Sequence, residues 1–345
     1  MAQQHLDPTD PSAAPATGDA LAGYLRAQAT EFLRALRLHR ETGGAAAGGS
    51  ADPVDAARAL RRSARRISGS LHTFRPLLEA DWSERIRPEL AWLSGTLALE
   101  HACEARLERL LTALQRLSGA IVPAQSDTGG PPAPAPAPDR GNLTVGAAKA
   151  GALLDRQLTL ARTRAHSTAL QALGSSRFHA VADHIAVLAS EVPLVATAPT
   201  ADLRPLARAA EERLTDAVAA LPLLTAGHPY NAEALVHGLS PDPSPHAQDA
   251  PWHQVRLLLR LHRYATEILL GAGGDVLLLA ASEALDRHRD ASEAASAAAQ
   301  AARTPRIAPA TAYALGVLHA DQRHEVEAAR FAFQQAWQKE PVSTS

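Results

Sequence analysis

Apolar residues recur at spacings of three and four along most of the chain, which is the period of amphipathic helices. Leu21, Leu25, Phe32 and Leu36 predict a first helix over residues 19–40. The same pattern predicts further helices over residues 53–78, 83–117, 145–190 with a break at the sequence GSSR, 201–221, 252–270, 275–303 and 309–339. Strict alternation of apolar and polar positions does not persist anywhere, so we expect an all-α fold.

The predicted helices form two sets of about four, and the second helix of each set carries several arginines. This plan suggests an internal duplication that produces two four-helix bundles. We place the bundles at residues 19–191 and 200–338, with the boundary at the sequence PLVATAPT. Residues 1–18 and 339–345 are expected to be tails, the first of them disordered, and the Pro/Gly-rich segment 124–141 is expected to be a linker loop with a polyproline II portion.

Composition restricts the class of protein. The single cysteine, Cys103, excludes an intramolecular disulfide and a cysteine-rich metal site. The first twenty residues lack the basic start and apolar core of a signal peptide. The most apolar short run, VLLLAA at 276–281, is too short to span a bilayer. We therefore expect a cytoplasmic protein.

Positive charge is concentrated on one predicted helix, although the whole chain has a formal charge of -2. On a helical wheel, one side of residues 53–78 is apolar, and the opposite side carries a group of arginines that we call the arginine ridge: Arg58, Arg61, Arg62, Arg65 and Arg66. Like charges one turn apart destabilise a helix by a few tenths of a kcal/mol per pair. An anion that binds to the ridge would relieve this repulsion.

A second basic face lies on the predicted helix 252–270. His253, Arg256, Arg260, Arg263 and Glu267 share this face, and Glu267 can orient Arg263 through an i, i+4 contact. Arginine suits phosphate because its planar guanidinium donates two parallel hydrogen bonds. Two interpretations stay open at this point: the arginines bind an anion, or they pair with acidic residues of neighbouring helices.

Four segments in order resemble a known family. They are LRRSARRISGSLHTFRPLL (60–78), WHQVRLLLRLHRYATEIL (252–269), LDRHRDA (285–291) and ATAYALGVLHADQRHEVEAARFAFQQAWQ (310–338). These segments are similar to the signature helices of the CHAD family, the conserved histidine α-helical domain. The similarity covers most of residues 20–338.

The resemblance implies two four-helix bundles that enclose a basic cleft for inorganic polyphosphate. The residues it assigns to the polyanion are Arg61, Arg65, Arg66 and Arg75 on one side, and His253, Arg256, Arg260, Arg263, Tyr264 and His288 on the other. Arg58 and Arg62, which complete the arginine ridge, are expected to contact the polyanion as well. The resemblance implies a structural role for Asp290, and the contact with Arg263 predicts one for Glu267. A place at polyphosphate granules would follow from such binding.

The chain also departs from the family pattern. Arg58 stands where the family has its signature histidine, and Arg62 occupies a position that is usually apolar. Leu257 and Leu261 replace residues that are usually basic, and Ala102 lies where an acidic element is expected. The resemblance therefore predicts the fold more firmly than the ligand.

Sequence motifs for catalysis are missing. The helix around His324 and Glu325 has Ala328 where a zinc hydrolase needs its second histidine, and the chain has neither a P-loop nor a G-x-S-x-G motif. We expect a non-enzymatic binding protein without metal or cofactor. Nucleic acid is a less suitable partner, because only Trp252 and Tyr264 could stack on bases near the basic faces. The alternative is a degenerate CHAD-like scaffold that binds protein partners, which the sequence does not identify, and lacks affinity for polyphosphate.

Overall fold

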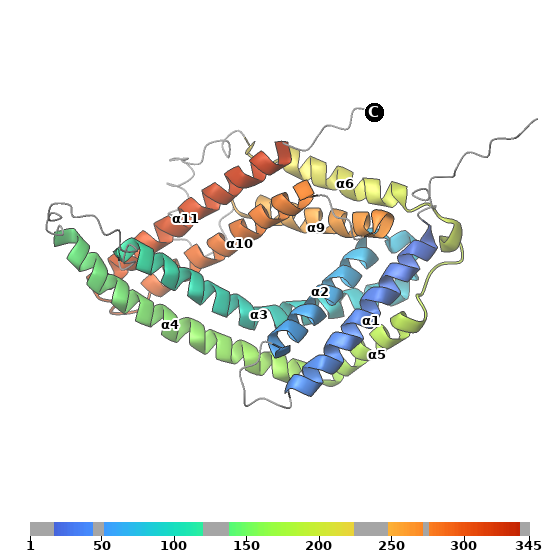
Figure 1. The fold of residues 1–345 in the computed structure, drawn as a ribbon, viewed down its shortest axis with the longest axis horizontal. Helices are drawn as coiled ribbons and strands as arrows, with labels where there is room; N and C mark the ends of the chain where they lie inside the picture. The colour runs from blue at the N-terminus through green and yellow to red at the C-terminus, as the bar shows by residue number, and fades with distance from the viewer. Residues whose placement is uncertain (1–16, 44–51, 120–137, 224–247, 272–275, 339–345) are drawn as a thin grey trace, which may run out of the picture. The chain divides into compact units, whose positions relative to one another are not determined.

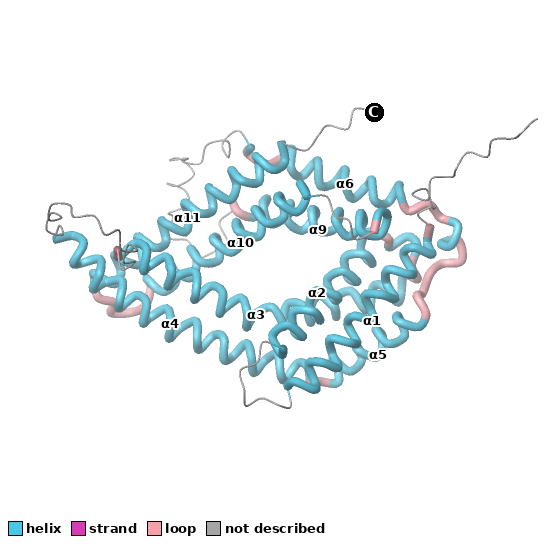
Figure 2. The backbone as a smooth tube through the Cα atoms, in the orientation of Figure 1, coloured by secondary structure: helices cyan, strands magenta, loops and turns pink. Residues whose placement is uncertain are grey.

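The computed structural model describes residues 17–43, 52–119, 138–223, 248–271 and 276–338, and nearly all of them are helical (Figures 1 and 2). Isolated β-bridges join Thr17 to Asp202 and Leu78 to Leu194. These described ranges contain no β-strand. The predicted all-α fold is confirmed.

Nine α-helices lie within the described ranges. They are α1 (Gly18–Gly43), α2 (Asp52–Thr73), α3 (Ala80–Ser118), α4 (Pro138–Leu173), α5 (Ser176–Ser190), α6 (Arg204–Ala219), α9 (Ala250–Leu270), α10 (Val276–Ala302) and α11 (Pro309–Gln338). Two short 3-10 helices, η2 (Arg75–Leu77) and η3 (Ala198–Thr200), lie in connecting segments.

Two helix ends differ from the prediction, and proline is involved in both. The α2 helix ends at Thr73 instead of Leu78, because Pro76 has no N–H to donate to the preceding turn. The α4 helix begins at Pro138, within the predicted linker, instead of at Val145. Proline is well tolerated at a first helical position, where the backbone N–H has no partner in the helix.

Several predicted segments lie wholly or partly outside the described residues. These are the N-terminal tail up to residue 16, the Gly-rich segment 44–51, the linker at 124–137, most of the loop at 227–247 and the tail 339–345.

The chain forms two compact units, each of which combines three stretches of sequence. Unit 1 consists of Met1–Ser94, His179–Glu212 and Leu261–Gly273, and unit 2 consists of Gly95–Phe178, Arg213–Arg260 and Gly274–Ser345. The α9 helix therefore contributes its first eleven residues to unit 2 and the remainder to unit 1. The boundary between residues 191 and 200 stays a prediction from the sequence.

In unit 1, α1 packs against α2 along their apolar faces. Phe32 of α1 and Ile67 and Leu71 of α2 are fully buried. Gly69 of α2 lies against the Tyr264 ring, where an added Cβ would come within 2.6 Å of Cδ2. The missing side chain allows α2 to approach Tyr264 closely.

Unit 2 has two apolar cores. One is built from α3, α4, α10 and α11 and is rich in alanine, and the other combines α6, α9 and α10 around Trp252 and Phe333. Small side chains such as Ala294, Ala298 and Ala314 allow α10 and α11 to pack at short range. None of the described helices has the length and apolar character needed to cross a bilayer.

Candidate anion-binding site

The arginine ridge, Arg58 to Arg66, belongs to α2 and lies on the side opposite the buried stripe of this helix; we now call it the α2 ridge. Arg58 and Arg62 are exposed, and Arg61 and Arg65 are half-buried. Arg58 forms a long i, i+3 ion pair with Asp55 at 3.4 Å. Such exposed pairs contribute little to stability. As predicted, these four arginines lie outside the buried stripe of α2, and their role in binding stays a prediction.

Arg75 is separate from the α2 ridge. It belongs to η2, and its Nε lies 2.9 Å from Oε1 of Glu84 on α3. Both side chains are about half exposed. Arg75 is therefore an ion-paired surface residue of unit 1.

Arg66 differs from the other arginines of the ridge because it is held by Glu267. Its Nε and Nη2 donate to the two carboxylate oxygens at 3.0 and 3.2 Å, and the hydroxyl of Tyr24 donates to Oε2 at 2.9 Å. The guanidinium also lies over the Tyr264 ring, 5.7 Å from its centre. This group, which we call the Glu267 clasp, joins α1, α2 and the unit 1 part of α9.

The electrostatics of the Glu267 clasp favour a structural role. Burial and the neighbouring Glu267 raise the pKa of Tyr24, so its hydroxyl keeps its proton. Burial alone would lower the pKa of Arg66, but the bonds to Glu267 outweigh it and the pKa is raised. Glu267, which the sequence paired with Arg263, thus has partners from two other helices that were not predicted.

A second group of basic side chains lies in unit 2. His253, Arg256 and Arg260 come from α9 and Arg289 comes from α10, and we call these four residues the arginine cluster. All four are half-buried. Burial lowers the pKa of Arg256, repulsion from Arg260 and Arg289 lowers it further, and Asp286 acts against these effects without cancelling them.

Carboxylates of α10 lie beside this cluster. Nε of Arg256 donates to Asp286 at 2.5 Å, and Nε of Arg289 donates to Asp290 at 2.9 Å. Arg106 of α3 bonds to Glu293 at 2.5 Å. Asp290, which the resemblance assigned to the structure of the cleft, is thus a half-exposed partner of Arg289. Arg289 and Arg106 were not predicted as part of the site.

His253 is influenced by charged side chains of the arginine cluster and its neighbours. Burial lowers its pKa; Arg256 and Arg289 act in the same direction, whereas Asp249 and Glu293 act against it. Its ring also lies 5.4 Å from the ring of His288, measured between centres. A bound anion would raise the pKa of His253 and so favour an additional positive charge in the cluster.

The structure places His288 in the core of unit 2, with a side chain only 1% exposed. Its neighbours form a buried polar group around Asp249, which we call the Asp249 cluster. Arg323 donates to both oxygens of Asp249 at 2.7 and 3.2 Å, Arg330 donates at 2.6 Å, and Ser292 donates at 2.6 Å. These bonds join the start of α9 to α10 and α11.

Asp249 was not predicted as part of a site, because it lies at the end of a segment for which the sequence predicts a loop. Its position directly before α9 was a usable signal, because aspartate is a preferred N-cap residue. The backbone oxygen of Asp249 indeed accepts from the N–H of His253 at 3.1 Å. Burial opposes ionisation of its carboxyl, but Arg323 and Ser292, which both donate hydrogen bonds to it, hold the pKa of Asp249 well below its usual range.

The buried position of His288 makes the stability of unit 2 depend on pH. Burial lowers its pKa to about 4, and Nε of Arg330 donates to its Nε2 at 3.3 Å, which requires an unprotonated nitrogen. In the unfolded chain the same ring is protonated below about pH 6.5. The unfolded state therefore binds more protons between these values, and stability falls as pH is lowered.

We expect acidification from pH 7 to 4 to reduce the unfolding free energy by on the order of 3 kcal/mol through His288 alone. Urea denaturation followed by helical circular dichroism, repeated at several pH values, measures this loss. His288→Gln should flatten the dependence between pH 6.5 and 4, and His179→Gln at an exposed position of α5 is the matched control. Equal slopes for wild type and His288→Gln would contradict the prediction.

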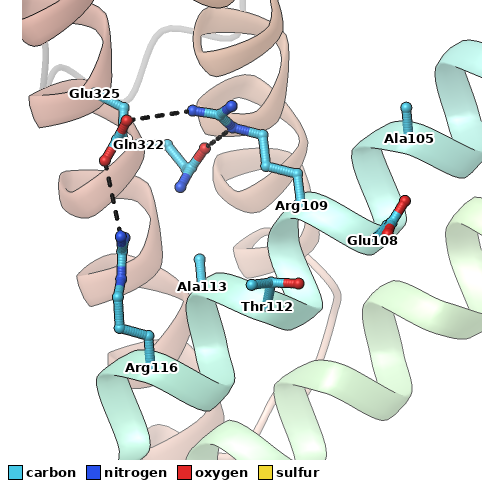
Figure 3. Close-up of a pocket in the computed structure, with 8 residues that line it drawn as sticks. All are labelled: Ala105, Glu108, Arg109, Thr112, Ala113, Arg116, Gln322 and Glu325. Carbon is cyan, nitrogen blue, oxygen red and sulfur yellow. Dashed lines mark hydrogen bonds and ion pairs between the residues drawn. The ribbon is translucent and has the colours of Figure 1, made fainter. Parts of the chain in front are cut away.

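A surface pocket of about 360 Å³ opens between α3 and α11 of unit 2 (Figure 3). Arg109 and Arg116 both point toward Glu325, at 3.7 and 3.8 Å (Figure 3). Arg109 also donates to Gln322 at 2.6 Å, and Arg116 pairs with Asp321 at 2.7 Å. The carboxylates of this pocket balance its two arginines, so it lacks the excess positive charge of the arginine cluster.

Other predicted residues have ordinary environments. Cys103 is half-buried. Trp252 is 1% exposed and packs against Phe333 and His288, so it serves the core. Within the described ranges, histidine, cysteine, aspartate and glutamate side chains do not gather into a group of three that could hold a metal ion.

Comparisons with known proteins agree with this architecture. The solved structure of PptA from Streptomyces chartreusis is 72% identical in sequence, with a TM-score of 0.79 over 94% of this chain and all of that chain. The crystal structure of the CHAD domain from the plant Ricinus communis matches with a TM-score of 0.50 over 95% of this chain and 96% of that one, at 18% identity, which shows the fold alone. No curated protein matches the chain. The family model for the CHAD domain matches residues 27–299, and the chain therefore belongs to the CHAD family.

Proposed function

We propose that this protein binds inorganic polyphosphate without catalysing a reaction on it. Each unit would offer its own binding surface: the arginine cluster in unit 2, and the exposed arginines of the α2 ridge in unit 1. The observation that carries the proposal is the arginine cluster itself: it combines several half-buried cations, and the pKa of Arg256 is lowered by burial and by Arg260. A site that repels its own charges gains most from an incoming polyanion.

The chemistry of the cluster suits phosphate. Guanidinium groups keep their charge at every physiological pH and donate paired hydrogen bonds to phosphate oxygens. The chain belongs to the CHAD family, and its sequence resemblance to that family implies inorganic polyphosphate as the ligand. Localisation at polyphosphate granules belongs to this proposal, because a protein that binds the polymer would collect where the polymer accumulates.

The alternative function is a protein-binding scaffold without affinity for polyphosphate. The observation that favours it is that several predicted ligands already have acidic partners. Arg66 bonds to Glu267, Arg75 to Glu84 and Arg256 to Asp286. These pairs reduce the positive charge that the two units offer to an anion.

A salt titration separates the two functions. We expect the protein to bind long-chain polyphosphate at low ionic strength, with an association constant that falls steeply and linearly in the logarithm of salt concentration. Counterion release from nucleic acids gives a slope of about -0.7 to -0.9 per phosphate contact, and a phosphate chain should behave similarly. Isothermal titration calorimetry at several sodium chloride concentrations measures the slope. Absence of binding at the lowest salt concentration would leave the scaffold as the supported function.

A further inference from the structure

Three carboxylates of α10 lie on the solvent side of the arginines that they contact in unit 2. Asp286, Asp290 and Glu293 follow one another at i, i+4 and i+7, so they share one face of the helix. We call them the carboxylate row. Each bonds to a different arginine: Arg256 of α9, Arg289 of α10 and Arg106 of α3.

Exposure shows which partner faces solution. The side chains of the carboxylate row are 49%, 48% and 42% exposed, whereas those of Arg256, Arg289 and Arg106 are 15%, 26% and 22% exposed. An anion that approaches from solution therefore meets the carboxylates before it reaches the guanidinium groups. Half-exposed carboxylates can turn into water at little energetic expense, since surface ion pairs contribute at most about 1 kcal/mol.

The arginines keep donors for a ligand while they hold these partners. A guanidinium has five N–H groups. Among the described residues, Asp286 bonds to Arg256 through Nε only, and Glu293 bonds to Arg106 through one terminal nitrogen. A phosphate can thus contact the same arginines, provided that it overcomes the negative charge of the row.

We infer that the carboxylate row is an internal competitor that restricts the arginine cluster to phosphate chains of several units. This inference rests on the proposed function and adds a selection rule to it. One phosphate group competes poorly against three resident carboxylates. A longer chain displaces all three together, because once one unit is bound the next is held at high effective concentration near its arginine.

The row also explains how an arginine-rich site avoids smaller anions. Burial opposes the charge of Arg289, yet Asp290, Glu293 and Asp286 more than compensate and raise its pKa. The carboxylate row therefore offsets part of the positive charge of the cluster until a ligand of high charge density arrives. Weakly charged anions gain too little from the arginines to displace the row.

The double variant Asp286→Asn and Glu293→Gln tests this inference with pyrophosphate, tripolyphosphate and long-chain polyphosphate as probes. We expect wild type to bind the long chain and to bind pyrophosphate and tripolyphosphate weakly. The variant should bind tripolyphosphate about tenfold more tightly, since two partly exposed ion pairs no longer compete. Its gain for the long chain should be smaller.

A matched control separates this competition from a general change in net charge. Asp216→Asn with Glu211→Gln on α6 removes the same two charges at exposed positions. It should leave tripolyphosphate affinity within about twofold of wild type, as expected for exposed charges that salt screens and that make no bond to the cluster's arginines in the described structure. A gain equal to that of the row variant would overturn the inference.

A double-mutant cycle tests whether Asp286 acts through Arg256. Asp286→Asn should tighten tripolyphosphate binding in the wild-type background and should have little effect in the Arg256→Gln background. The effects of substitutions at two contacting residues are not additive. If wild type binds the long chain but the row variant selects ligands as wild type does, the competitor inference fails and the proposed function stands. If neither protein binds the long chain at low salt, both fail.

Discussion

Replacing Asp249 by asparagine is expected to reduce the unfolding free energy by about 3–5 kcal/mol, the usual effect of removing one partner of a buried ion pair. Asp249 is fully buried and accepts hydrogen bonds from Arg323 and Arg330, which are themselves almost fully buried. Asparagine has a similar shape but no charge. Glu327 would remain to balance Arg330, so one guanidinium would be left in the core without a counter-charge.

Urea denaturation followed by helical circular dichroism measures the loss, and hydrogen exchange should place it in α9, α10 and α11. Asp55→Asn is the matched control, because Asp55 makes only an exposed pair with Arg58 and should change stability by less than about 1 kcal/mol. Ser292→Ala removes a single bond to Asp249 and should cost about 1 kcal/mol. Equal stability of Asp249→Asn and Asp55→Asn would refute a central role for Asp249.

The largest expected effect on binding comes from reversing two charges of the arginine cluster. Arg256→Glu with Arg260→Glu should weaken polyphosphate binding by at least about 100-fold at low salt. The plot of the logarithm of the association constant against the logarithm of salt concentration should become shallower by the slope of roughly two phosphate contacts. Arg256 and Arg260 lie one turn apart on α9 and repel each other, so both contribute to the field that attracts an anion. Calorimetric titration with long-chain polyphosphate measures both quantities.

The control for this pair lies on α6. Arg208→Glu with Arg213→Glu makes the same change in net charge at exposed positions and should reduce affinity only slightly. In the Arg256→Glu variant the new carboxylate would repel Asp286, which can impair folding. The uncharged pair Arg256→Gln and Arg260→Gln tests the same site without this repulsion. Unchanged affinity in both cluster variants, with normal helicity, would move the binding site elsewhere.

Sequence periodicity was sufficient for most of the fold. Helix positions follow from local spacing, so the stripe that contains Leu60, Ile67 and Leu71 located α2 and its exposed arginines. Pro138 was misassigned because the alternation of alanine and proline before it is typical of an extended linker. Local composition cannot show that a helix begins at the last proline of such a run.

The site was harder to predict, because its contacts join residues far apart in the chain. Glu267 was assigned to Arg263 on its own helix, whereas the structure pairs it with Arg66, 201 residues away. Arg289 was overlooked because the surrounding segment was interpreted through its histidine and aspartate. His288 is in the core because α9 and α11 cover it, and helical periodicity on α10 alone does not include those neighbours.

The residues of the Glu267 clasp are synthesised at different times, which delays the formation of their contact while the chain is being translated. Tyr24 and Arg66 leave the ribosome long before Glu267, which follows them by 243 and 201 residues. Unit 1 therefore cannot complete this contact during translation of its first two helices. Contacts between residues so far apart in the chain slow folding, so closure of unit 1 awaits the synthesis of α9.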